Sequence, residues 1–147
     1  MSIFTPLFFY FLANPAYAED TPQETIDLQG TWVLDVKASL NRCFRLEMHD
    51  CKGKDRAVVE QKMQADIDKK GTFSVAFQGQ SIKVTFGDQS DQKTYSFVHQ
   101  GYSYAVINIE QEDRSPETLV FIKDAPGVIC MGENFPKSDT LCLRKKP

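Results

Sequence analysis

The chain has 147 residues and a formal net charge of −3. This length suits one domain, and the near balance of charge excludes the basic surface by which proteins bind nucleic acid or anionic membranes. The one basic cluster, Arg144 to Lys146, is a short chain end, so we expect no nucleic-acid partner.

An apolar run, Ile3 to Ala13, opens the chain, and Ala16-Tyr17-Ala18 supplies a small-x-small cleavage pattern. The run is shorter than the roughly twenty residues that a membrane-spanning helix needs. No Lys or Arg precedes it, which departs from the usual signal peptide. We predict a signal peptide over residues 1–18, a periplasmic or secreted protein, and no stable membrane insertion after cleavage. A polar, flexible lead-in is expected at 19–27, followed by one domain at 28–147.

The first patterned stretch contains the only tryptophan, Trp32. Residues 31–37 alternate as a half-buried strand, with Trp32 and Leu34 on one face. The alternation then stops, and residues 38–48 and 55–70 predict two helices around a polar turn. Asp55 is placed to begin the second helix and Gly71 to end it.

From residue 72 onward the pattern is that of β-strands separated by short turns. The expected strands are 73–77, 82–86, 95–99, 102–109, 118–123, 128–131 and 140–144. The polar residues 87–92 have the composition of a loop. With the first strand this makes about eight, and an eight-stranded meander removes its exposed edges by closing on itself. We predict a mainly β fold: an antiparallel up-and-down barrel with a helix–turn–helix inserted after the first strand.

The four cysteines, Cys43, Cys51, Cys130 and Cys142, are an even number in a chain expected to be exported, which favours two disulfides. Three pairings are open, and we favour Cys43–Cys51 with Cys130–Cys142 because both are local. The first bridge requires the first helix to end before Cys51. The rival interpretation is a metal site with His49 or His99, but their spacing matches no strong ligand pattern. We expect no metal.

Catalytic motifs are absent from the sequence. It has no Gly-x-Ser-x-Gly, phosphate loop or dinucleotide fingerprint, and it has only two histidines. Ser103 near His99 is a common chance arrangement. Glu110, Glu112 and Asp113 beside Arg114 are interpreted as a charged loop tip, since nothing nearby predicts a dry cleft. We therefore expect neither an enzyme nor a cofactor.

The stretch Leu28-Gln29-Gly30-Thr31-Trp32-Val33-Leu34 resembles the opening Gly-x-Trp strand of the calycins, which include lipocalins and fatty-acid-binding proteins. In that superfamily a late Arg packs across the Trp, and Arg144 is at the matching position. The order of one strand, two helices and a β-meander is similar to fatty-acid-binding proteins, whose helices form a portal. The resemblance implies that Gly30, Trp32 and Arg144 are structural closure residues. Gly30, without a Cβ, permits a close approach there.

Two motifs of these families are missing, so the fold transfers better than the ligand. Arg144 is followed two residues later by Lys146, whereas fatty-acid-binding proteins have an Arg-x-Tyr clamp. The lipocalin Thr-Asp-Tyr signature is also absent.

The leading hypothesis for function is an exported, non-enzymatic barrel that binds a small apolar molecule, with the helices covering its mouth. The residues expected to line the cavity are Phe73, Val75, Ile82, Val84, Tyr95 and Phe97. The alternative is a module that binds an envelope protein, such as a periplasmic hydrolase inhibitor. That alternative predicts a filled barrel with function in loops 110–116 or 132–139.

Overall fold

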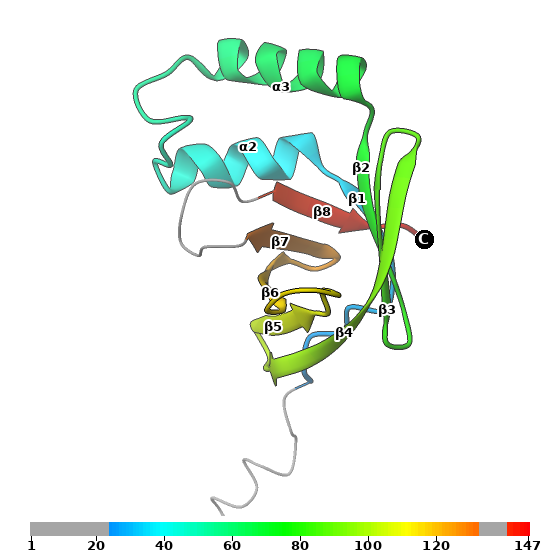
Figure 1. Ribbon diagram of the computed structural model, residues 1–147. Coiled ribbons are helices and arrows are strands. Elements are labelled where there is room, and N and C mark those ends of the chain that lie inside the picture. The colour runs from blue at the N-terminus through cyan, green and yellow to red at the C-terminus, as the bar shows by residue number, and fades with distance from the viewer. Residues whose placement is uncertain (1–23, 133–140) are drawn as a thin grey trace, which may run out of the picture.

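The computed structural model describes residues 24–132 and 141–147. Eight antiparallel strands form a closed barrel in which neighbours in sequence pair and β1 pairs with β8 (Figure 1). The strands are β1 (Gly30–Leu34), β2 (Phe73–Gln78), β3 (Ser81–Phe86), β4 (Gln89–Gln100), β5 (Tyr104–Ile109), β6 (Glu117–Ala125), β7 (Val128–Gly132) and β8 (Leu141–Lys145). Two helices, α2 (Val36–Arg45) and α3 (Arg56–Lys70), lie between β1 and β2. The predicted barrel with its inserted helix pair is confirmed, and it is compatible with a calycin-like fold.

The helix boundaries follow from local capping. The Asp35 carboxylate accepts a hydrogen bond from the Ala38 N–H at 2.9 Å, so α2 begins at Val36 and the first strand ends earlier than residue 37. Asp55 caps α3 in the same way, and Gly71 ends it as predicted. The polar residues expected as a loop at 87–92 instead begin β4 at Gln89, because they pair with β3 in a continuous ladder.

The barrel interior is packed with aromatic and aliphatic side chains. The Phe77 ring lies edge-on to Tyr95 and to Phe121, with ring centres 5.3 and 5.5 Å apart. The buried residues of this core are Ile26, Leu28, Trp32, Val75, Phe77, Ile82, Tyr95, Ala105, Ile107, Ile109, Leu119, Phe121, Ile129 and Leu143. Each strand contributes alternate residues, as expected for a barrel wall.

Residues 24–29 close one end of the barrel. The Ile26 N–H donates to the Gly101 carbonyl at 2.8 Å, and the Trp32 indole N–H donates to the Leu28 carbonyl at 2.8 Å. Ile26 and Leu28 are buried. Residues 24–27, the end of the lead-in predicted at 19–27, are held to the core by Ile26. The signal peptide predicted at 1–18 lies outside the described residues.

The side chain that packs over Trp32 is Lys145 and not Arg144. Trp32 pairs with Lys145 in the β1–β8 register, and the Lys145 ammonium lies 5.6 Å from the centre of the indole. Arg144, one residue earlier, faces outward and forms an ion pair with Asp35 at 2.8 Å. The role expected for Arg144 was wrong because adjacent strand residues face opposite sides. At Gly30 the φ is +112°, a conformation that favours glycine, and a Cβ there would lie 3.1 Å from Lys145 Cε.

Helix α2 lies against the outer wall of the barrel rather than over its mouth. Figure 1 shows α2 along β8, with α3 on the far side of α2. Ser39 Oγ accepts a hydrogen bond from the Cys142 N–H at 2.9 Å, and Arg42 pairs with Asp124 of β6 at 3.1 Å. Asp124 is reached because a bulge shifts the β6–β7 register between Lys123 and Ala125. These contacts overturn the expectation that the helices cover the mouth.

Both predicted disulfides are present. Cys43–Cys51 joins the end of α2 to the turn before α3, and α2 ends at Arg45 as that bridge requires. Cys130–Cys142 joins β7 to β8 beneath α2, where both cysteines are fully buried and Ala38 packs against them. No free cysteine remains among the described residues.

Candidate functional site in the barrel wall

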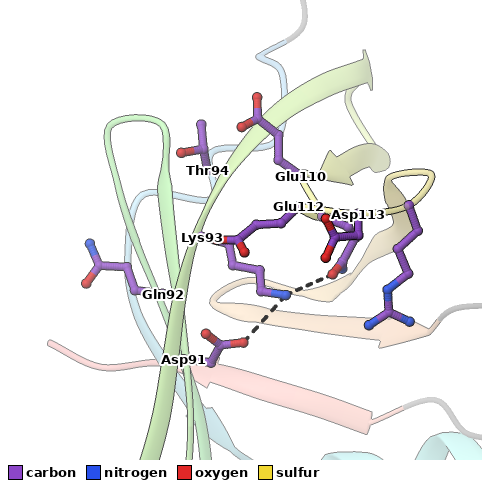
Figure 2. A pocket seen from close by; sticks show the side chains of 9 residues that line it. Asp91, Gln92, Lys93, Thr94, Glu110, Glu112 and Asp113 are labelled. Carbon is purple, nitrogen blue, oxygen red and sulfur yellow. Dashed lines mark hydrogen bonds and ion pairs between the residues drawn. The ribbon is translucent and has the colours of Figure 1, made fainter.

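A charged groove lies in the barrel wall, between β4 and the loop that joins β5 to β6 (Figure 2). Its volume is about 600 Å³. The lining residues come from two short segments, 91–94 and 110–114. The first is the early part of β4 and the second is the charged loop. The groove is therefore formed by two segments that are separated in the sequence and meet only in the folded chain.

A smaller, more apolar pocket adjoins this groove. It has a volume of about 210 Å³ and is lined by Ile82, Val84, Asp91, Lys93, Ile109 and Glu117. The strand register explains why these six residues lie together: Ile82 pairs with Lys93, Val84 with Asp91, and Ile109 with Glu117. Residues that pair across strands share one face of the sheet, so these side chains lie on the face that carries the buried Ile82 and Ile109. Asp91 and Lys93 line both the pocket and the groove.

Lys93 connects the two sides of the site. Its ammonium donates to the Gln111 side-chain oxygen at 2.9 Å and lies 3.7 Å from an Asp91 carboxylate oxygen (Figure 2). These two contacts leave donor capacity on an ammonium group that has three N–H bonds. Lys93 was not predicted as a site residue, because the strand was expected to begin at Tyr95. The available signal was a lysine in phase with the buried Tyr95.

Carboxylates outnumber cations in the groove. The acidic lining residues are Asp91, Glu110, Glu112 and Asp113, and the basic ones are Lys93 and Arg114. The sequence predicted only a solvated loop tip for residues 110–114. The fold brings this loop beside β4, and the two form one surface. This excess favours ligands that carry positive charge next to an apolar group.

The six residues predicted to line a cavity have three different placements. Val75 and Tyr95 are buried in the packed core, and Phe73 is half-buried against it. Phe97 is 38% exposed. Only Ile82 and Val84 line the apolar pocket. The predicted wall is thus mostly core, because large rings such as Phe77 and Phe121 fill the space between the strands.

Tyr95 belongs to a hydrogen-bond network at the closed end. Its hydroxyl donates to the Gly79 carbonyl at 3.0 Å and accepts from the Gln29 amide at 3.1 Å. Gln29 also accepts the Gly79 N–H at 2.9 Å. Burial raises the pKa of the Tyr95 hydroxyl above its ordinary value near 10; the nearby Asp27 adds to this, and the Gln29 hydrogen bond opposes it.

This pKa predicts a loss of stability at high pH. Because the unfolded chain ionises Tyr95 first, the contribution of Tyr95 is present below pH about 10 and is lost as pH rises through the raised folded-state pKa. Tyr95→Phe should lower the free energy of unfolding by about 1 kcal/mol near neutral pH. The variant should also lose less stability as the pH rises above about 10. Urea unfolding of Tyr95→Phe and of the exposed control Tyr102→Phe, across this pH range, checks it. If the free energy of unfolding fell equally steeply with pH in both variants, the raised pKa would not belong to Tyr95.

The other candidate groups do not assemble a site. The His99 ring stacks on Tyr104 with centres 4.7 Å apart, and both Cys43 and Cys51 are in a disulfide. Within residues 24–132 and 141–147, no group of three or more His, Cys, Asp or Glu residues is arranged to hold a metal ion. No helix in the same ranges is long and apolar enough to cross a membrane.

Comparison with known proteins assigns no relative: no protein-family model, no curated protein and no solved structure matches the chain.

Proposed function

We propose that this is an exported, non-enzymatic binding protein whose ligand site is the groove and pocket beside β4. The observation that carries the proposal is the apolar pocket of Ile82, Val84 and Ile109 beside a larger charged groove. An apolar group of the ligand enters the pocket, and its polar part lies in the groove. The two disulfides support an oxidising compartment.

The pocket limits what can enter. At about 210 Å³ it is smaller than the roughly 300–1,000 Å³ typical of pockets that enclose a whole small molecule. The ligand therefore places only a short apolar group inside, and the rest remains in the groove. A long-chain lipid buried along the barrel axis does not fit, because Phe77 and Phe121 occupy the interior below.

Filling the pocket should weaken the binding of an apolar probe. The probe is N-phenyl-1-naphthylamine, a neutral fluorophore that the acidic groove does not repel. We expect Val84→Trp to weaken its affinity at least tenfold, because the new ring occupies the pocket. The matched control is Val58→Trp on α3, where the native side chain is 59% exposed. Fluorescence titration measures both; equal affinity in the two variants, or no binding by the unmodified protein, contradicts the proposed site.

The second candidate, a protein-binding module, is favoured by the packed interior. Val75, Ile107, Phe121 and Leu143 have no exposed surface, which suits a barrel that acts through its rim rather than through a deep cavity. The groove borders the charged loop that this alternative identified, residues 110–116.

A further inference from the structure

One part of the barrel wall has a free strand edge. β4 is 12 residues long, but its ladder with β5 begins only at Tyr95, opposite Ile109. Residues 89–93 pair with β3 alone. β5 is shorter, and the chain leaves it after Ile109 to form the loop that bounds the far side of the groove. The groove is therefore the gap beside an unpaired strand edge.

The backbone groups of this edge point into the groove. The Tyr95 N–H donates to the Gln80 carbonyl on the β3 side, whereas the Thr94 carbonyl accepts the Glu110 N–H on the β5 side, both at 2.9 Å. Because successive residues of a strand alternate in direction, the N–H and C=O groups of Ser90 and Gln92 also face the β5 side. Neither residue has a backbone hydrogen bond on that side within the described part of the chain.

We propose that an extended segment of a partner polypeptide binds here by adding a strand to the free edge of β4. Strand addition obtains affinity from main-chain hydrogen bonds and specificity from pockets for alternate side chains. The inference rests on the proposed function in one respect, since one side chain of the segment enters the same apolar pocket.

The site also defines the sequence that it accepts. A residue of the added strand opposite Asp91 or Lys93 points toward the barrel interior, over the pocket of Ile82, Val84 and Ile109. That position takes one apolar side chain of moderate size. The carboxylates of the groove outnumber its cations, four to two, so the flanking residues are Lys or Arg. A second copy of this chain is disfavoured as occupant, because it would bring two acidic grooves together.

The test compares two variants of Gln92, whose backbone N–H faces the groove. Gln92→Pro removes the N–H that faces the groove, whereas Gln92→Ala keeps it and changes only the side chain. Each protein is used to select from a phage library of random linear nonapeptides. We expect the unmodified protein and Gln92→Ala to enrich peptides with one apolar residue between basic residues, and Gln92→Pro to lose at least tenfold in affinity for them. Far-ultraviolet circular dichroism confirms that each variant is folded.

The inference is overturned if the unmodified protein enriches no peptide, or if Gln92→Pro and Gln92→Ala bind the peptides with equal affinity. Concentration-dependent dimerisation that Gln92→Pro abolishes, without peptide enrichment, also overturns it in favour of a second copy. Binding of N-phenyl-1-naphthylamine separates this failure from failure of the proposed function. A Gln92→Pro protein that still binds the probe retains the pocket and lacks only the edge.

Discussion

Replacing Asp124 by alanine is expected to lower the free energy of unfolding by about 3–5 kcal/mol, because it leaves a buried arginine without its charge partner. The Arg42 side chain is only 9% exposed, and its guanidinium lies 3.1 Å from Asp124, whose own side chain is 14% exposed. The Arg42 Nε has no hydrogen-bond partner, so no other group of the described chain compensates at that atom. Urea denaturation monitored by circular dichroism measures the loss.

The control for this prediction is Arg45→Ala. Arg45 contacts the same Asp124 oxygen at 3.0 Å, but its side chain is 57% exposed. Water screens such a pair, so its removal should cost less than about 1 kcal/mol. Similar losses in Asp124→Ala and Arg45→Ala would show that Arg42 is not the residue that makes Asp124 important. The assignment of α2 to the outer wall would then lose its main energetic support.

Gly87→Ala should be nearly as damaging, at about 3 kcal/mol. Gly87 forms the β3–β4 turn with a φ of +64°, and a Cβ there would lie 2.5 Å from the Lys70 carbonyl oxygen at the end of α3. The left-handed conformation costs an L-residue about 1–2 kcal/mol. Steric overlap with fixed backbone adds about 1–3 kcal/mol. The midpoint of urea unfolding should fall accordingly.

Gly127→Ala separates the two causes. Gly127 has a φ of +74° in the β6–β7 turn, and a Cβ there meets nothing within 4 Å. It therefore carries the conformational cost alone, about 1 kcal/mol. If both variants lost the same stability, steric overlap with the end of α3 would not add to the cost of Gly87→Ala.

Local patterns in the sequence account for most of the fold that was predicted correctly. Alternation identified the strands, Asp55 and Gly71 bounded α3, and short separations favoured both disulfides. These features depend on residues close together in the chain, where spacing alone specifies geometry. The start of β4 was not predicted, because the exposed strand residues 89–92 have the composition of a loop.

The candidate site was recovered only in part. Ile82 and Val84 were assigned to a ligand-contacting wall and do line the pocket, but Val75 and Tyr95 are core. Lys93 was missed, and the acidic loop at 110–114 was set aside as solvated. Which inward positions stay open depends on how far large rings from distant strands reach, and the sequence of one strand does not contain that information.

The sequence by itself determined an eight-stranded barrel with a helix pair after the first strand, because the strand period and the capping residues are local. The tertiary structure alone decided three features. Strand register put Lys145 rather than Arg144 against Trp32. The Arg42–Asp124 pair, 82 residues apart, joins α2 to the outer wall. The unequal lengths of β4 and β5 left an open edge in a barrel that is otherwise closed, and this difference appears only when the two strands are paired.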